Sequence, residues 1–322
     1  MILIISAEQD DHTQAVLRSL KQMQAAATVL DLAHFPQQAQ LAINFGARDG
    51  SHESVFSNYD GDLTFSQCRA VWWRRPRPFL LHPEILDAAS RTFAYTECSA
   101  AISGLWLGLD AFWVNHPMRE EEALRKAYQL KIAQQVELTI PNTLITNNPN
   151  RARAFVSRHG FNRTVYQSFS SSEQSWRETP LGQSQAMAEL DKVCYAPVIF
   201  QERIPTQVDL RIVVIDGTIF SIAIGAHDNE HKVEHRMAVG RLRGEAFELP
   251  SLIVERIHQL MQQLGLVYGV VDLRLTPDGQ YIFQEVNPSG PWLWLEECTN
   301  LPITQTFARF LAAQDGQKIG DK

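Results

Sequence analysis

The sequence predicts a multidomain protein of the α/β class, in which a parallel α/β domain precedes lobes of mixed α and β structure. Up to about residue 115, apolar strands alternate with helical patterns, as in a parallel βαβ domain. Residues 116–200 combine helices with short strands, and residues 201–322 contain strands joined by hairpin turns. A chain of 322 residues is long enough for two or three such units.

The first region opens with the strand "MILIIS" and a helix whose start is marked by "DDHT". The strand "ATVLDL", a polar stretch and a hairpin around "NYDGDLTF" follow. The strand "AVWWRRP" then leads into a long helical pattern that runs through "ILDAASRTFAYTECSAAISGLWLGL". Because the region lacks GxGxxG, we expect no dinucleotide there.

The second region begins with a helix in "VNHPMREEEALRKAYQLKIAQQVELTIP", where Leu124, Tyr128 and Ile132 follow helical spacing. The stretch "PNTLITNNPNRARAFVSRHG" predicts a short strand, a turn and a second helix, and "RTVYQSFS" predicts another strand. A Ser-rich polar stretch continues to about residue 185, and its composition predicts a mobile loop.

The third region begins at the strand "APVIFQERI". The dipeptide Asp216-Gly217 between two apolar runs predicts a hairpin. A helix in "SLIVERIHQLMQQLG", a hairpin turning at "TPDG" and a final helix near "PITQTFARFLAA" follow.

Composition limits the cellular setting and the partners. The net charge of −7 argues against a dedicated nucleic-acid surface, so "WWRRPRP" fits a structural or carboxylate-binding role better than a nucleic-acid patch. The four cysteines are isolated, as in a reducing cytoplasm. The start has no cationic signal segment, and "LWLGLDAFWV" is too short to span a bilayer. We expect a cytoplasmic protein that binds neither membrane nor nucleic acid.

Two acids interrupt the last hairpin, "GVVDLRLTPDGQYIFQEVNPSG", where strands normally disfavour them. Asp272 and Glu285 lie on opposite sides of the turn, and antiparallel pairing brings both to one edge, with Asn287 just beyond. Two carboxylates and a carboxamide suit Mg²⁺. The alternative is that each acid only pairs with an arginine such as Arg274.

These segments resemble those of the ATP-grasp superfamily of carboxylate–amine and carboxylate–alcohol ligases. "VDLR" with "FQEVNPSG" resembles the metal-binding hairpin, and "APVIFQERIPTQVDLRIVV" the inter-lobe hinge and ribose-contacting segment. "KAYQLKIAQQVELTIPNTLITNNP" resembles the entry to the nucleotide lobe, and "VWWRRPRP" and "EVNPSGPWLWLE" are most similar to the graspetide (microviridin-type) branch.

The resemblance implies a three-lobed ATP-grasp fold. Residues 1–115 would form a pre-ATP-grasp α/β domain, residues 116–200 a central nucleotide-binding lobe, and residues 201–322 a C-terminal lobe with the metal site. ATP would lie between the last two lobes.

The same resemblance implies the roles of individual residues. Asp272, Glu285 and Asn287 would bind Mg²⁺, Lys126 a phosphate and Asp209 the ribose, with adenine near the backbone of Gln201, Glu202 and Ile204. Arg211, Arg236 and Arg274 would be the cationic residues of the catalytic step, with Arg211 and Arg236 holding the triphosphate or an acyl phosphate. Surface ion pairs are the alternative for Arg211 and Arg236.

The chain departs from the family at Gln167, where a second phosphate-binding lysine is usual. An amide carries no charge, so ATP binding would be weaker, or Arg163 or Arg177 would substitute. A degenerate, non-catalytic nucleotide- or peptide-binding protein is the remaining reading, against which the intact metal-binding residues argue.

The resemblance implies ATP- and Mg²⁺-dependent conversion of a carboxylate to an acyl phosphate, which a hydroxyl or amine then attacks. In the graspetide branch both groups are side chains of one ribosomal precursor peptide, whose leader binds the central lobe partly as a helix in a groove. The expected partners are the leader and core of such a peptide and, in a homodimer, a second copy of this chain. The alternative substrate is an amino acid or small molecule.

His227, His231 and His235 recur every four residues and would line one face of a helix, as zinc ligands do. The surrounding "HDNEHKVEHRM" is rich in charge and lies between a strand and a loop. A solvated face beside the active site accounts for it better than zinc does.

Overall fold

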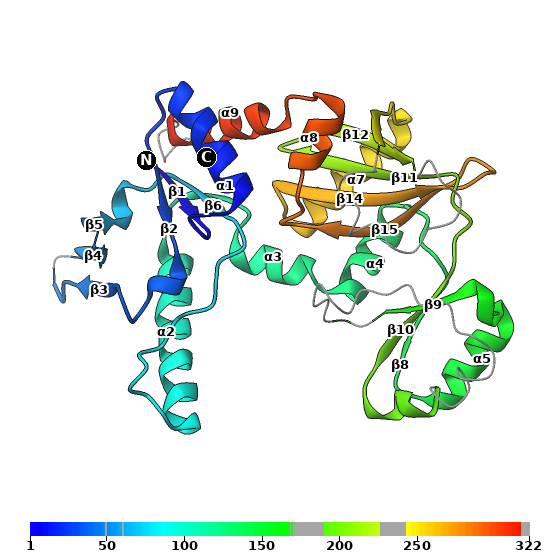
Figure 1. The fold of residues 1–322 in the computed structure, drawn as a ribbon, viewed down its shortest axis with the longest axis horizontal. Coiled ribbons are helices and arrows are strands. Elements are labelled where there is room, and N and C mark those ends of the chain that lie inside the picture. Colours follow the sequence, from blue (N-terminus) through cyan, green and yellow to red (C-terminus); the bar gives the residue numbers. More distant parts are fainter. Residues whose placement is uncertain (49, 60, 168, 170–189, 226–242, 317–322) are drawn as a thin grey trace.

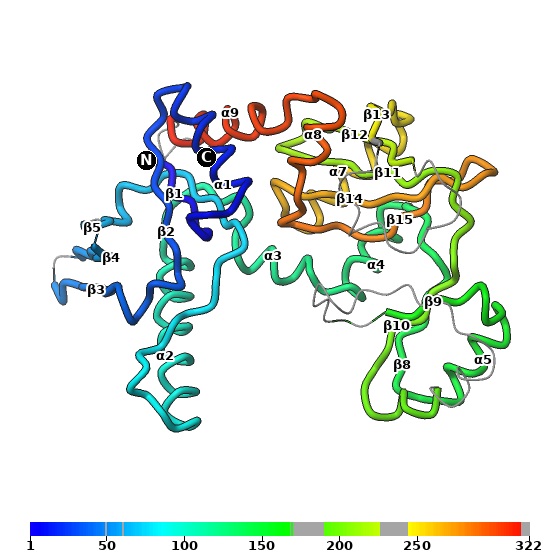
Figure 2. Tube along the Cα trace, in the orientation of Figure 1, coloured from blue at the N-terminus to red at the C-terminus, as the bar shows by residue number. Residues whose placement is uncertain are grey.

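The computed structural model describes residues 1–48, 50–59, 61–167, 169, 190–225 and 243–316. An N-terminal domain, a small central lobe and a larger C-terminal lobe follow one another along the chain (Figure 1). The last helix returns to the first domain, where Asp315 forms an ion pair with the N-terminal amino group of Met1. The tube in Figure 2 shows the two ends of the described chain close together.

The N-terminal domain is built on a four-stranded sheet in the order β2-β1-β6-β7, and all of its pairings are parallel. Its elements are β1 (Ile2–Ile5), α1 (Asp11–Gln22), β2 (Ala27–Leu30), β6 (Ala70–Trp73), α2 (Ala88–Gly108) and β7 (Phe112–Val114). Asp10 caps α1 by accepting from the Thr13 backbone N–H, at the site that "DDHT" predicts. The expected parallel α/β domain is therefore confirmed.

A second, antiparallel sheet projects from this domain in the order β3-β4-β5. Its strands are β3 (Gln40–Phe45), β4 (His52–Asn58) and β5 (Gly61–Thr64). The pairing of β4 with β5 confirms the hairpin expected around "NYDGDLTF". β3 lies in the stretch that composition marks as polar; its pairing with β4 makes it a strand, although most of its side chains are exposed.

The helix expected after residue 116 is two helices, α3 (Pro117–Ala123) and α4 (Lys126–Gln135). The backbone becomes extended at Arg125, and Gln129 Nε2 donates to the Ala123 carbonyl at the end of α3. Leu124 is 56% exposed at this break, although its spacing predicts a buried position. Hydrogen bonding by Gln129 thus accounts for an interruption that apolar periodicity does not show.

The central lobe is a three-stranded antiparallel sheet in the order β8-β10-β9, covered by α5. Its elements are β8 (Thr143–Thr146), α5 (Pro149–His159), β9 (Thr164–Gln167) and β10 (Val198–Glu202). Ala152 and Val156 of α5 and Phe200 of β10 lie in one apolar cluster, so the helix and sheet share a small core. The Ser-rich stretch predicted as a loop lies mostly outside the described residues.

The C-terminal lobe contains a five-stranded antiparallel sheet in the order β13-β12-β11-β14-β15. Its strands are β11 (Val208–Ile215), β12 (Thr218–Gly225), β13 (Arg243–Ala246), β14 (Tyr268–Leu275) and β15 (Tyr281–Asn287). Its helices are α7 (Ser251–Leu264), α8 (Leu293–Thr299) and α9 (Ile303–Gly316). The hairpins expected at Asp216-Gly217 and at "TPDG" are both confirmed.

The two faces of this sheet pack against different parts of the molecule. One face, with Leu210, Val271 and Phe283, shares a core with α4 and α7. The other face, with Val213 and Val270, shares a core with α9, the segment around Trp292 and the N-terminal domain. Residues two apart on a strand point to the same face. The charged side chains that alternate with these apolar positions therefore lie on the remaining part of that second face.

No helix in the described part of the chain is long and apolar enough to cross a bilayer. The four cysteines are free thiols. We propose that the domains follow the sheets, since the limits expected at residues 115 and 200 fall close to the ends of β7 and β10.

Candidate active site

Two acids face each other on the second face of the five-stranded sheet. Asp272 of β14 is in register with Glu285 of β15, and the next pair joins Leu273 to Phe283, so Gln284 forms a bulge. Like charges directly opposite each other on an antiparallel pair repel. This arrangement therefore needs compensating cations, and the sheet and α4 supply them.

Lys126, at the first position of α4, compensates Glu285. Its Nζ lies 3.0 Å from Glu285 Oε2 and also donates to the carbonyl of the bulged Gln284 at 3.0 Å. The lysine side chain is 13% exposed and the glutamate 24%, so the pair is partly screened from water. The structure thus places the predicted phosphate lysine directly beside a predicted metal ligand.

Arg211 and Arg274 compensate the acids of the neighbouring strands. Arg211 of β11 is in register with Asp272, and its Nε lies 3.5 Å from Asp272 Oδ1. Arg274 of β14 is in register with Asp209 and donates from Nε to Asp209 Oδ1 at 3.1 Å. With Lys126 and Glu285, three cations and three carboxylates among the described residues lie together on one part of the sheet.

One N–H group of Arg211 makes no hydrogen bond within the described residues. Its Nε is buried and has no hydrogen-bond partner within the described residues, since the contact to Asp272 is an ion pair without hydrogen-bond geometry. Its guanidinium lies 5.9 Å from the ring centroid of Trp294. A buried N–H without an acceptor costs free energy, so Arg211 fits a site that an anionic oxygen completes.

Asn287 ends β15 two residues after Glu285, and its Oδ1 accepts from the Ser289 backbone N–H at 3.1 Å. Two carboxylates and an amide oxygen on one strand pair are hard oxygen donors of the kind Mg²⁺ takes. In the part of the chain that the structure describes, no group of three or more His, Cys, Asp or Glu residues could hold a metal ion. The donor chemistry therefore fits Mg²⁺ with phosphate oxygens and not an all-protein cage.

The predicted adenine-contacting segment is the end of β10. Gln201 is 3% exposed and donates from Nε2 to Thr143 Oγ1 at 3.1 Å. The Glu202 backbone N–H donates to the Asn142 carbonyl at 2.9 Å, and Ile204 follows in the connection to β11. These residues join the central sheet to the strand that carries Asp209 and Arg211.

Gln167 ends β9, where it is half-buried and in register with Ile199 of β10. Arg163, one of its two expected substitutes, is 67% exposed and lies 3.5 Å from Glu202. Arg177, the other substitute, lies outside the described residues, as do Arg236 and the three histidines His227, His231 and His235.

A set of residues that the sequence did not single out fixes the turn after Asn287. Four backbone carbonyls on either side of Asn287 accept hydrogen bonds from side chains of other segments; they belong to Val286, Pro288, Ser289 and Gly290. The donors are Gln129 to Val286 (2.9 Å), Asn115 to Pro288 (3.0 Å), Arg74 to Ser289 (2.6 Å) and the Tyr268 hydroxyl to Gly290. A Cβ at Gly290 would lie 2.5 Å from Val270, so only glycine fits there.

Glu120 of α3 also holds this turn. Its Oε1 accepts from the Ser289 hydroxyl, and its Oε2 is buried without a hydrogen-bond partner in the described structure. Burial raises the pKa of Glu120 to about 7, although the Ser289 hydroxyl and the charge of Arg74 act in the opposite direction. The only sequence signal for these residues was the pair of arginines in "WWRRPRP".

His12 of α1 attaches the N-terminal domain to the segment just after the turn. Its Nε2 accepts from the backbone N–H groups of Trp292 at 2.9 Å and Leu293 at 3.3 Å. Burial, followed by the charge of Arg74, lowers the pKa of His12 to about 3. The ring is therefore neutral at physiological pH, as an acceptor at Nε2 requires.

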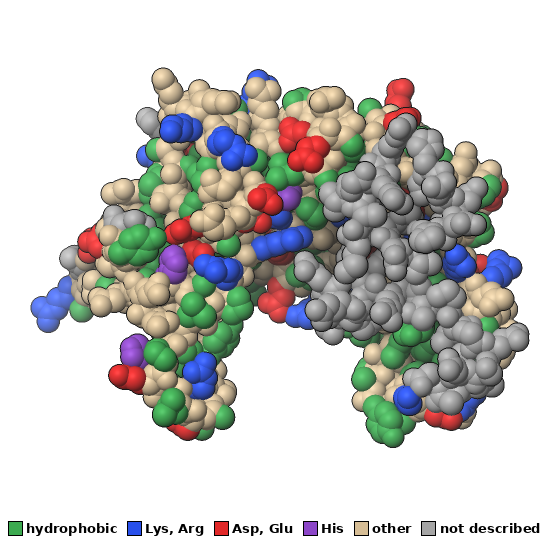
Figure 3. Space-filling model, viewed as in Figure 1, with side chains coloured by type: hydrophobic (Ala, Val, Ile, Leu, Met, Phe, Trp, Pro, Cys, Tyr) green, Lys and Arg blue, Asp and Glu red, His purple; other side chains and the backbone are tan. Residues whose placement is uncertain are grey.

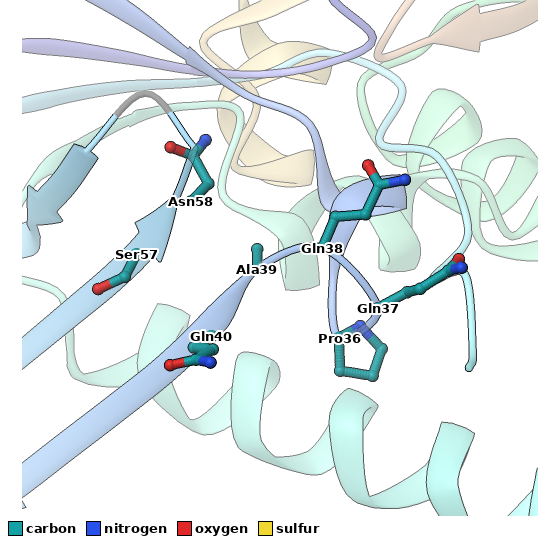
Figure 4. A pocket seen from close by; sticks show the side chains of 7 residues that line it. All are labelled: Pro36, Gln37, Gln38, Ala39, Gln40, Ser57 and Asn58. Carbon is teal, nitrogen blue, oxygen red and sulfur yellow. The ribbon is translucent and has the colours of Figure 1, made fainter.

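A separate pocket lies in the N-terminal domain beside β3 and β4 (Figure 4). Side-chain amides dominate its lining: Pro36, Gln37, Gln38, Ala39, Gln40, Ser57 and Asn58. It contains no charged residue and none of the predicted site residues.

Comparison with known proteins identifies the class of the fold. Residues 1–121 match the family model of the MvdD pre-ATP grasp domain. The macrocyclase MdnC of Microcystis aeruginosa MRC, solved with its precursor peptide MdnA, is 27% identical with a TM-score of 0.85 over 97% of this chain and 99% of that one. The search of curated proteins gave no match.

Two further structures share the fold. The RiPP-associated ATP-grasp ligase of Chryseobacterium gregarium, in complex with ADP and a leader and core peptide, is 24% identical with a TM-score of 0.86 over 97% and 96% of the two chains. The ATP-grasp ligase PsnB, complexed with minimal precursor, Mg and ADP, is 23% identical with a TM-score of 0.79 over 98% and 97%.

The fold is that of an ATP-grasp ligase with an N-terminal pre-ATP-grasp domain. Within that class, the chain is similar to the macrocyclase MdnC over nearly its whole length, and its first domain matches the MvdD pre-ATP grasp model.

Proposed function

We propose that this ligase uses ATP and Mg²⁺ to join Asp or Glu side chains of a ribosomal precursor peptide to Thr, Ser or Lys side chains of the same peptide. The observation that carries the proposal is the opposed pair Asp272 and Glu285, balanced by Arg211 and Lys126, in a chain with the fold of a peptide macrocyclase. The bound precursor of MdnC and the ADP and Mg of PsnB support the choice of substrate and cofactors.

The arrangement of charges suits phosphoryl transfer. When bound, Mg²⁺ would neutralise phosphate oxygens and make the terminal phosphorus open to attack by a carboxylate. Asp272, Glu285 and Asn287 would hold it, while Lys126 and Arg211 pair with the two carboxylates and orient them. Arg211 would also direct its unused buried N–H toward a phosphate oxygen.

The nucleotide would lie across the junction of the two sheets. We place adenine at the backbone of Gln201, Glu202 and Ile204 and the ribose at Asp209. Arg274 steadies the Asp209 carboxylate through its hydrogen bond, which leaves the second oxygen of that carboxylate as a candidate acceptor for a ribose hydroxyl. Arg236 remains a proposed acyl-phosphate contact.

Mass spectrometry of a precursor peptide tests the function directly. Purified protein should be incubated with ATP, Mg²⁺ and a peptide encoded beside this chain's gene that carries repeated Thr or Ser and Asp or Glu. We expect the peptide to lose one water for every bond formed, and Asp272→Asn to leave it unchanged. ATP turnover with free amino acids, and none with the peptide, would favour the small-molecule alternative.

Gln167→Lys tests whether residue 167 faces the phosphates. The added ammonium should tighten binding of a non-hydrolysable ATP analogue by about 1–2 kcal/mol, because a charge-assisted hydrogen bond replaces a neutral one. Calorimetric titration of both forms measures this. Gln24→Lys, at an exposed position of the N-terminal domain, controls for the added charge. Equal affinity in both forms would place residue 167 away from the nucleotide.

The proposal also covers the cellular location and the oligomeric state. The free thiols support a reducing, cytoplasmic location. Exposed apolar side chains just before α2 (Leu86) and within it (Phe93 and Leu107) support a homodimer. Figure 3 shows hydrophobic atoms along this projecting arm, across a notch from the arm formed by the central lobe.

A further inference from the structure

The turn that carries the last metal ligand is held more firmly than its length requires. Between Val286 and Gly290, four backbone carbonyls accept hydrogen bonds from side chains of other segments. Three of these bonds reach only the backbone, so they could form with a turn of any sequence. Ser289 differs, because its backbone and side chain are each bonded by a charged or ionisable residue from elsewhere.

Three contacts converge on Ser289. Its backbone N–H donates to Asn287 Oδ1 at 3.1 Å and so orients the amide oxygen proposed as a metal ligand. Its carbonyl accepts from Arg74 at 2.6 Å, and its hydroxyl donates to Glu120. Arg74 is 1% exposed and Glu120 is 8% exposed, so water does not compete for either contact.

We infer that Glu120 and Ser289 form a positioning pair, which fixes the Asn287 carboxamide in the orientation that binds Mg²⁺. Glu120 does not touch the metal site; it holds the Ser289 hydroxyl, and the Ser289 backbone N–H holds Asn287. Arg74 restrains the same residue from the N-terminal domain. The inference rests on the proposed function, since it assumes that Asp272, Glu285 and Asn287 bind the metal.

Groups that orient metal ligands from behind commonly contribute about ten- to a hundred-fold to metal affinity. Burying Glu120 with one oxygen unpartnered is costly, and a structural role alone would be served by an apolar side chain. A residue kept in place at such a cost is expected to show its effect in metal binding and not only in stability.

The test measures Mn²⁺ binding by electron paramagnetic resonance in the presence of ADP, alongside thermal unfolding. We expect Ser289→Ala and Glu120→Ala each to weaken Mn²⁺ binding about ten- to a hundred-fold. Glu120→Gln should stay close to the parent, because its amide oxygen still accepts from Ser289. The double alanine variant should be no weaker than either single variant, as for two residues acting through one bond.

Thr306→Ala is the control, because it removes another side-chain hydroxyl that donates a hydrogen bond, to the Pro302 carbonyl at the start of α9, away from the turn. Parent-like Mn²⁺ affinity in Ser289→Ala, which leaves both backbone contacts of residue 289 intact, would overturn the inference even if Glu120→Ala does not fold. Asp272→Asn separates the two proposals. If it too binds Mn²⁺ normally, the metal-site assignment itself fails.

Discussion

Glu285→Gln is expected to lower ligation by more than about 10²-fold while the fold persists. Loss of a residue that only orients a metal ligand already lowers metal affinity or activity by up to about 10²-fold, so loss of a ligand's own charge should have a larger effect. The fold persists because the Gln carbonyl oxygen can still accept from Lys126 Nζ, which also donates to the Gln284 carbonyl. Peptide dehydration measures ligation, and thermal unfolding measures whether the fold persists.

The matched control is Glu245→Gln, on the outermost strand of the same sheet, where the side chain is exposed. It removes the same charge from β13 and should leave both measurements unchanged. Full activity in Glu285→Gln would show that this carboxylate only pairs with Lys126. The metal assignment would then be wrong.

Arg211→Lys is expected to lower the rate of ligation about 10²–10³-fold and to weaken nucleotide binding much less. Lysine keeps the positive charge beside Asp272 but loses the planar fork, the buried Nε–H and the packing near Trp294. If that N–H is satisfied only as charge develops on the transferring phosphoryl group, the loss falls on the catalytic rate. Single-turnover ligation and equilibrium titration of the ATP analogue separate rate from binding.

Arg256→Lys provides the control for this exchange. Arg256 pairs with Glu137 at 2.9 Å, and that glutamate is 77% exposed, so the pair is a solvent-screened one. Its substitution should change neither quantity. Equal losses of rate and of affinity in Arg211→Lys would instead place Arg211 among the ground-state contacts of the nucleotide.

Local patterns predicted the centre of the site because its two acids are joined by one short hairpin. The "TPDG" turn fixes how β14 and β15 pair, and the apolar alternation fixes which residues share a face, so Asp272 and Glu285 are opposed by geometry that lies within fourteen residues. The parallel N-terminal sheet was predictable for a similar reason, since its order follows from alternating strands and helices.

The contacts that complete the site come from distant segments, and no local pattern encodes them. Arg74 reaches Ser289 across 215 positions, and Glu120 reaches the same residue across 169. The break between α3 and α4 depends on one side-chain bond from Gln129, and α8 is a short helix within "PWLWLEECT" that periodicity does not distinguish from a loop. Long-range hydrogen bonding decides these features, and it becomes visible only in three dimensions.

The attachment of the N-terminal domain limits how this enzyme could be recombined with its relatives. The Asn115 amide makes four hydrogen bonds to the backbone: its Nδ2 donates to the carbonyls of Tyr268 and Pro288, and its Oδ1 accepts from the N–H groups of Val267 and Tyr268. His12 and Arg74 add bonds to the same region. A chimera that imports another protein's first domain therefore also replaces the supports of the metal-ligand turn. Such a graft could exchange the substrate range only if the imported domain carries His, Arg and Asn at the positions of His12, Arg74 and Asn115.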